Sequence, residues 1–172
     1  MDRKIFVLGT NHPLQCGCSP FTELDIEKFR KFIRVLCRAN DIKSIAEEMT
    51  DYGLKEYSSQ NTICQSVALE LNIDISHVDI EQELREKLGI DDLSLSKAAI
   101  PDGKVMPDAT LKELYVSNLS NPIRECSWLA RIIIQNSWPT LLVCGSNHVK
   151  GIVPRANKIG VETVILSEDY KP

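Results

Sequence analysis

The chain has 172 residues, of which 43% are hydrophobic and 26% are charged, and its formal net charge is −4 at pH 7. This length and composition are typical of one soluble globular domain spanning residues 1–172. The acidic balance and the lack of any block of lysine and arginine argue against a nucleic-acid-binding protein. No apolar run approaches the roughly 18 residues of a membrane span, which argues against an integral membrane protein.

Six cysteines are present, an even number that disulfides could use. Cys37, Cys126 and Cys144 occur inside apolar patterns, however, where free cysteine behaves as a small hydrophobic residue. The first residues lead directly into an apolar run and lack the pattern of a signal peptide. We therefore expect a cytoplasmic protein with reduced thiols.

Short apolar runs alternate with helical patterns along the chain. The first run, residues 4–9, is continuously apolar, as expected of a strand buried on both faces. Further strands are predicted at residues 41–46, 75–80, 139–145 and 161–166. Helices are predicted at residues 22–37, 61–71, 81–88, 108–115, 121–135 and 149–158. This alternation predicts an α/β fold with a mostly parallel central sheet and helices on both faces.

Capping residues set the expected helix boundaries. Thr22 and Asp25 have the spacing of a capping box at the start of a helix. Gly89 is placed to end the helix predicted at residues 81–88. Asn121 followed by Pro122 is a typical helix start. Loops are predicted at residues 10–20, 50–59 and 90–107, and the last of these is the easiest place for a mobile lid.

Two matching segments, residues 7–12 and 143–148, are the strongest indication of a functional site. Each is an apolar run that reaches a glycine, then a hydroxyl residue, then asparagine and histidine. His12 and His148 are two of only 3 histidines in the chain. Ligands of open α/β sheets bind at the carboxyl ends of the strands. The two turns therefore predict one site built from both ends of the chain.

Two pairs of charged residues join these histidines as candidates. Glu47 and Glu48 end the second predicted strand. Glu125 precedes Leu129 by four residues, which places it on the apolar face of its predicted helix. Arg124 is predicted in the first turn of that helix, where the helix dipole disfavours a cation. Charges placed against local preference are candidates for function.

This set of side chains suits two kinds of chemistry, both leading to hydrolysis. His12, Glu48 and His148 could hold a divalent metal such as Mn²⁺, Co²⁺ or Zn²⁺, with an open position for water. Alternatively, a histidine or glutamate acts as general base on water while Arg124 stabilises an oxyanion. A Cys–His nucleophile near His12 has less support, because Cys16 and Cys18 lack the Cys-x-x-Cys spacing.

Each candidate also has a purely structural interpretation. A single histidine after a strand is more often a turn or capping residue, and we interpret His77 in this way. Taken alone, the acidic pair would be a solvated loop and the Arg-Glu pair a surface ion pair. The coincidence of all four groups favours a site. No dinucleotide-binding, P-loop or Gly-x-Ser-x-Gly pattern occurs in the sequence.

The order of these motifs resembles the superfamily of erythromycin esterase, ChaN, TraB and Tiki proteins. His12 and His148 match its histidines, Glu47 and Glu48 match its acidic pair, and Arg124 with Glu125 matches its Arg-Glu/Asp motif. The resemblance implies an α/β fold with a pocket of His, Glu and Arg. Activities in the superfamily include esterases, metal-dependent proteases and haem binding. This chain is much shorter than the esterases and lacks their helical insertions.

We therefore expect a hydrolase of esterase or metallopeptidase type that acts on a small molecule or peptide. Its expected catalytic residues are His12, Glu47, Glu48, Arg124, Glu125 and His148, with Arg124 positioned by Glu125. The competing hypothesis is a sensor that binds a metal, haem or a small anion in the same pocket without turnover. A homodimer is expected from base rates alone, since no heptad pattern specifies an assembly.

Overall fold

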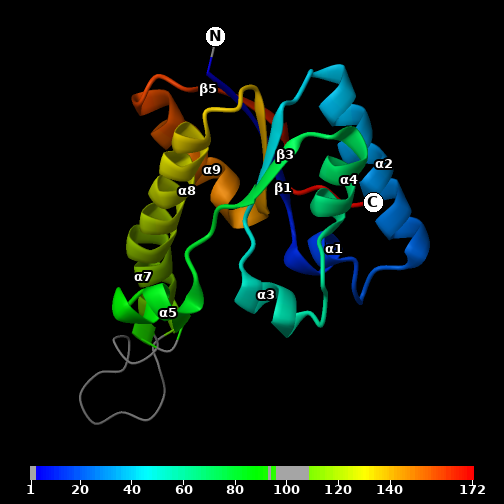
Figure 1. Cartoon of the computed structure of the whole chain (residues 1–172). Helices are drawn as coiled ribbons and strands as arrows, with labels where there is room; N and C mark the ends of the chain where they lie inside the picture. The colour runs from blue at the N-terminus through cyan, green and yellow to red at the C-terminus, as the bar shows by residue number, and fades with distance from the viewer. Residues whose placement is uncertain (1–2, 93, 96–108) are drawn as a thin grey trace.

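The computed structural model describes residues 3–92, 94–95 and 109–172, and its centre is a five-stranded parallel sheet (Figure 1). The strands have the order β3-β2-β4-β1-β5, and every pairing between them is parallel. Their bounds are β1 (Lys4–Thr10), β2 (Ser44–Glu47), β3 (Asp74–His77), β4 (Thr140–Gly145) and β5 (Glu162–Ser167). The predicted α/β fold with a parallel sheet is thus confirmed.

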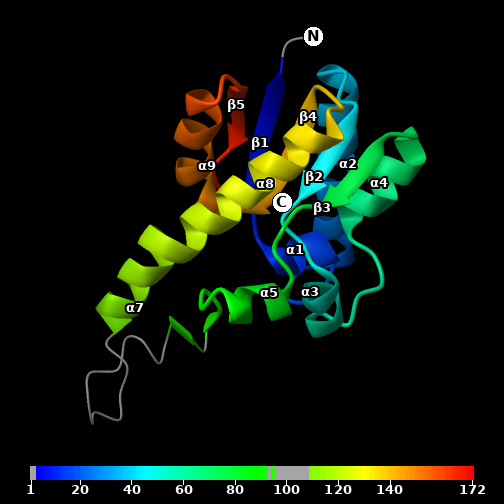
Figure 2. The ribbon, with the colours of Figure 1, turned by 60° about the vertical axis from the view of Figure 1, so that its left-hand side comes forward.

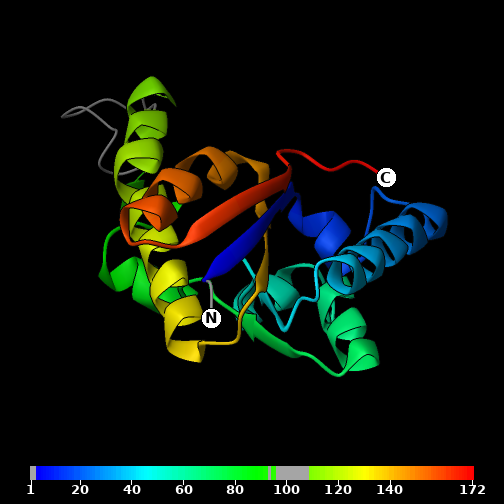
Figure 3. The ribbon, with the colours of Figure 1, turned by 90° about the horizontal axis from the view of Figure 1, so that it is seen from above.

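Helices cover both faces of this sheet, as predicted (Figure 3). The face shared by α1 (His12–Cys16), α2 (Glu23–Ala39) and α4 (Ile63–Leu71) encloses one hydrophobic core. The opposite face packs against α8 (Asn121–Gln135) and α9 (Ser146–Lys158), and encloses a second core. Successive strand residues point to opposite faces. Accordingly, Ile45 lies in the first core and Ala46 in the second.

Caps account for several of the observed boundaries. Thr22 and Asp25 form both bonds of the predicted capping box at the start of α2, and Thr62 with Gln65 does the same for α4. Gly89 has a φ of 68° just after α5 (Gln82–Lys87), as expected of a glycine that ends a helix.

Two predicted loops contain short helices, so these loop predictions were wrong in part. Residues 10–20 include α1, and residues 50–59 include α3 (Asp51–Glu56). Each helix begins at a capping side chain: Asn11 accepts a hydrogen bond from Leu14 N, and Thr50 accepts one from Gly53 N. Residues 93 and 96–108, which make up most of the predicted 90–107 loop, lie outside the described residues.

The helix predicted at residues 121–135 is α8, but Asn121 does not cap a free helix end as predicted. The helix α7 (Ala109–Tyr115) continues through a π-helical turn, η1 (Val116–Ser120), directly into α8 (Figure 2). Proline in a regular α-helix clashes with the carbonyl four residues earlier, and the wider π turn lies immediately before Pro122. Arg124 therefore lies inside a continuous helical run, and the argument from the helix dipole does not apply to it.

The carboxyl ends of β1, β2 and β4 meet at one edge of the sheet, because the three strands are adjacent and parallel. Thr10 pairs in register with Gly145, and Glu47 pairs with Val143. The helices α3 and α5 lie beyond this edge (Figure 1). Among the described helices, none is both long enough and apolar enough to cross a membrane.

Candidate functional site

Glu48 is the centre of a charged cluster at this edge. It follows β2 directly and is only 1% exposed. One carboxylate oxygen, Oε2, accepts a hydrogen bond of 2.6 Å from Gly145 N. The other, Oε1, accepts a hydrogen bond from Arg124 and lies 3.6 Å from His12 Nε2 and 3.4 Å from His148 Nε2. Both predicted histidines therefore meet at one oxygen atom.

His12 is the accessible member of the cluster, with a side chain that is 36% exposed. It is the first residue of α1, which the Asn11 cap holds against the end of β1. Its Nδ1 is buried without a hydrogen-bond partner among the described residues, so Nε2 is the nitrogen that can reach a ligand. Burial lowers the pKa of His12, but Glu48 outweighs this effect and raises the pKa above 6.5.

His148 is the buried counterpart of His12, in the first turn of α9. Its Nδ1 lies 2.9 Å from Glu125 Oε1, and Glu125 Oε2 forms an ion pair of 2.8 Å with Arg155. Burial lowers the pKa of His148, but the hydrogen bonds to Glu125 and Glu48 raise it to about 9. His148 is therefore protonated at neutral pH.

Arg124 is held by Asp79 and Glu48, so the prediction that Glu125 positions it was wrong. The guanidinium bonds both oxygens of Asp79, from Nε at 2.9 Å and from Nη2 at 2.8 Å. Trp128 Nε1 also donates to Asp79 Oδ1 at 3.0 Å, and its ring lies 5.4 Å below the guanidinium carbon. Consecutive helical residues project about 100° apart, so Arg124 and Glu125 face different neighbours.

The predicted acidic pair is divided between the two faces of the sheet. Glu48 faces α8 and α9, whereas Glu47 is fully buried toward α4. Glu47 Oε2 accepts a hydrogen bond of 2.6 Å from Thr62, and Oε1 is buried without a hydrogen-bond partner among the described residues. Burial raises the pKa of Glu47 to about 7. His77 Nε2 lies 3.8 Å from Glu47 Oε2, so this histidine stays outside the Glu48 cluster.

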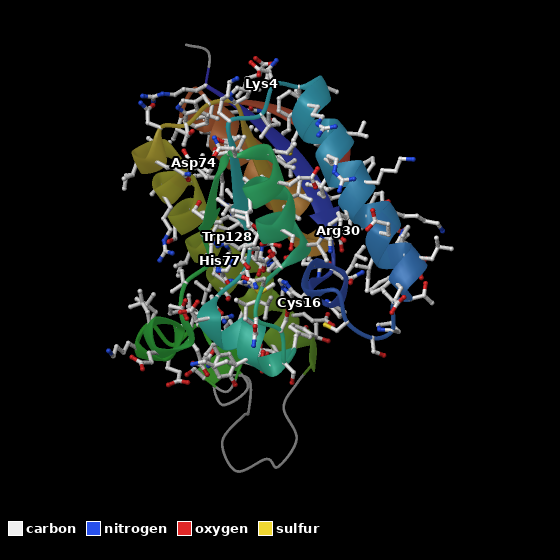
Figure 4. The ribbon with its side chains drawn as sticks, turned by 45° about the vertical axis from the view of Figure 1, so that its right-hand side comes forward. Lys4, Cys16, Arg30, Asp74, His77 and Trp128 are labelled. Carbon is white, nitrogen blue, oxygen red and sulfur yellow. The ribbon has the colours of Figure 1, made fainter. Side chains whose placement is uncertain are left out.

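Three members of the cluster were absent from the predicted site. Asp79 lies two residues beyond β3 and near the carboxyl end of the strand predicted at residues 75–80, and this position was the available indication. Arg155 has no such indication, because it lies two turns along α9 from His148. Trp128 packs in the core and also donates a hydrogen bond to Asp79. Trp128 and His77 lie toward the same end of the sheet, opposite Lys4 (Figure 4).

Two cavities border the cluster and share His12, Glu48 and Arg124 in their walls. The smaller cavity, of about 170 Å³, also contacts Tyr57 and Arg85. The larger, of about 370 Å³, also contacts His148 and the turn at residues 145–147. A ligand could therefore span the cluster from one cavity to the other.

The surroundings of Cys16 do not favour its use as a nucleophile. Burial raises the pKa of the Cys16 thiol to about 12. The thiolate is the reactive form of cysteine, and a thiol with this pKa is almost entirely protonated at neutral pH.

The charges around Glu48 do not fit a divalent metal well. His12, Glu48 and His148 face one point, but Arg124 bonds Glu48 and its Nη1 lies 3.4 Å from His148 Nε2. A metal ion there would have to displace this fixed positive charge, and protonated His148 has no lone pair to offer. Within the part of the chain that the structure describes, no three His, Cys, Asp or Glu side chains are arranged to hold a metal. The metal-bound version of the site stays a prediction.

Gly151 on α9 packs directly against the Glu125 carboxylate. A methyl group added at Gly151 would clash with both oxygens of Glu125, and that carboxylate is held by both His148 and Arg155. Gly151→Ala is expected to lower the free energy of unfolding by about 1 to 3 kcal/mol. It should also move the pKa of His148 from about 9 toward 6.5, as measured by NMR titration of the imidazole ring.

Gly53→Ala is the matched control for this prediction. Its added methyl group would meet the Met49 sulfur at 3.1 Å and Thr50 Oγ1 at 3.4 Å, and neither atom belongs to the Glu125 contacts. An unchanged His148 pKa in Gly151→Ala would show that Glu125 does not set the protonation of this histidine.

No protein-family model, curated protein or solved structure matches the chain. The resemblance to the erythromycin esterase, ChaN, TraB and Tiki superfamily therefore stays a prediction from the order of the motifs.

Proposed function

We propose that the protein is a metal-independent hydrolase that uses His12 as general base and Arg124 with His148 as the electrophilic pair. The observation that supports this most strongly is the convergence of two histidines and an arginine on one buried oxygen of Glu48, beside two open cavities. Buried charges with perturbed pKa values in a cleft are typical of active sites.

His12 is the best candidate for the base because it lines both cavities, and its buried Nδ1 leaves Nε2 as the nitrogen for proton transfer. The 3.6 Å between Nε2 and Glu48 Oε1 is longer than a hydrogen bond, so the lone pair of neutral His12 is free to accept a proton from water. The resulting hydroxide attacks an acyl carbon, the acyl–oxygen or acyl–nitrogen bond breaks, and the leaving group takes the proton back from His12.

Arg124 and His148 form two adjacent positive donors. Arg124 Nη1 lies 3.4 Å from His148 Nε2, and both groups carry charge at neutral pH because each is paired with buried carboxylates. Two fixed cationic donors in a site that is largely shielded from water would stabilise the oxyanion that develops during acyl transfer. Glu48, Asp79 and Glu125 hold the donors in place.

The test is hydrolysis of p-nitrophenyl esters and of chromogenic peptides by the wild type and by single histidine variants. We expect His12→Ala to lower turnover by roughly 100- to 10,000-fold with folding intact, since this side chain is partly exposed. His77→Ala is the matched control, because its histidine lies beside Glu47 rather than Glu48, and it should keep turnover. Equal loss in both variants would argue against the assigned base.

The pH dependence follows from the two histidines. Turnover should rise as pH passes the pKa of His12, which lies above 6.5, because the base must be neutral. It should fall as pH passes about 9, because His148 then loses its proton. Activity that EDTA abolishes and Mn²⁺, Co²⁺ or Zn²⁺ restores would instead support a metal enzyme. Ligand binding without turnover of any ester or peptide would support the sensor hypothesis.

A further inference from the structure

The smaller cavity contains an arginine that the proposed reaction does not use. Arg85 comes from α5, which lies beyond the carboxyl edge of the sheet beside α3 (Figure 2). It contacts the same 170 Å³ cavity as His12, Tyr57 and Arg124. Arg85 is partly buried, and its Nε is fully buried without a hydrogen-bond partner among the described residues.

The other arginines near the site already have carboxylate partners. Arg124 is paired with Glu48 and Asp79, and Arg155 is paired with Glu125. Arg85, by contrast, forms no ion pair within the described ranges, although several acidic residues surround it. These neighbours are Glu56, Glu86, Asp91 and Asp92, which line a further cavity that Arg85 also contacts. Glu56 lines the smaller cavity as well.

An arginine that has a buried donor without a partner and no ion pair among the described residues is suited to bind an anion when it lies beside a cavity. Burying a donor without a partner is unfavourable, and a ligand that supplies an acceptor removes this penalty. The planar guanidinium binds carboxylate and phosphate groups through two parallel hydrogen bonds. A cavity of about 170 Å³ has room for only a small group of this kind.

We propose that Arg85 binds a carboxylate or phosphate group of the substrate in the smaller cavity. The reacting acyl group would then lie at the rim that both cavities share, next to His12. This assignment of a substrate class rests on the proposed hydrolase function, whereas anion binding by Arg85 does not. The protein would accordingly select small esters or amides that carry a negative charge at one end.

Binding is tested first, without turnover. Isothermal titration with succinate and, separately, with inorganic phosphate distinguishes the two anions. Arg85→Gln is expected to lower the affinity for the preferred anion at least tenfold, and Arg85→Glu is expected to abolish binding. Arg38→Gln is the matched control, because Arg38 is an exposed residue of α2 that contacts neither cavity of the cluster. Thermal melting checks that each variant is folded.

Turnover is tested with two esters of similar size, p-nitrophenyl butyrate and mono-p-nitrophenyl succinate. Arg85→Gln should raise KM for the charged ester at least tenfold and leave the neutral ester unchanged. Anion binding that survives Arg85→Gln, or a wild type that binds neither anion, would overturn the inference even if hydrolysis is found. Anion binding that depends on Arg85 without any hydrolysis would uphold it and reject the hydrolase.

Discussion

Glu48→Gln is expected to lower the free energy of unfolding by about 3 to 5 kcal/mol, because it removes the one carboxylate that lies against both Arg124 and His148 in the buried cluster. Glu48 bonds both Arg124 and the Gly145 N–H, and it lies beside His148. Glutamine has nearly the same shape but no charge, so the hydrogen bond from Gly145 can persist while the attraction to Arg124 and His148 is lost. Urea unfolding at pH 7, followed by circular dichroism, measures this loss.

The pH dependence of the same variant gives an independent check. Burial raises the pKa of Glu48, but His12, His148 and Arg124 outweigh burial and hold the pKa well below 4.5. A depressed carboxyl pKa contributes stability that is present above 4.5 and is lost as the pH falls toward the folded-state pKa. The difference between wild type and Glu48→Gln should therefore shrink in acid.

Glu168→Gln is the control for Glu48→Gln. Glu168 is 57% exposed and lies 3.8 Å from the exposed Lys150, and surface pairs of this kind contribute about 0 to 1 kcal/mol. A Glu48→Gln variant as stable as Glu168→Gln would contradict the view that Glu48 neutralises the cluster.

Glu47→Gln is expected to have the opposite effect and to stabilise the protein at pH 8. The pKa of Glu47 is raised from 4.5 to about 7, so binding of a proton by Glu47 stabilises the folded state. This stabilisation is complete below pH 4.5 and is lost as the pH rises through 7. Above pH 7 the fold must hold a buried carboxylate whose Oε1 has no hydrogen-bond partner among the described residues. Glutamine removes that charge, with a gain of up to about 3 kcal/mol at about 1.4 kcal/mol per pKa unit.

Thermal melts of Glu47→Gln at pH 4.5 and pH 8 measure this effect. At pH 4.5 the wild-type carboxyl is largely protonated, and the variant should be within about 1 kcal/mol of the wild type. At pH 8 the melting temperature of the variant should be higher. A variant that is less stable than the wild type at pH 8 would show that Glu47 is ionised and favourably paired in the fold.

Glu47 and Glu48 illustrate what local sequence can predict and what depends on tertiary packing. The sequence places Glu47 and Glu48 together at the end of a strand, and strand geometry requires that they point to opposite faces. Local pattern does not tell which helices cover which face. Only the packed structure puts α8 and α9 over Glu48 and α4 over Glu47.

The sequence by itself determined the α/β fold, the meeting of His12 and His148, and the burial of Glu125. Each follows from short-range regularities: strands alternate with helices, parallel strands end at one edge, and every 3.6 residues a helix returns to the same face. Spacing alone was misleading at Asn121, where the π turn carries the helix onward into α8.

The tertiary structure alone decided which charges pair within the site. Asp79 binds Arg124 across 45 positions of the chain, and Glu48 reaches Arg124 across 76. Such contacts depend on the strand order β3-β2-β4 and on where α8 crosses the sheet. Hydrophobic periodicity shows that a side chain is buried but does not identify its neighbours, because many packings bury the same face equally well. The partners of Arg124 and Glu125 therefore emerge only when the helices and strands are assembled.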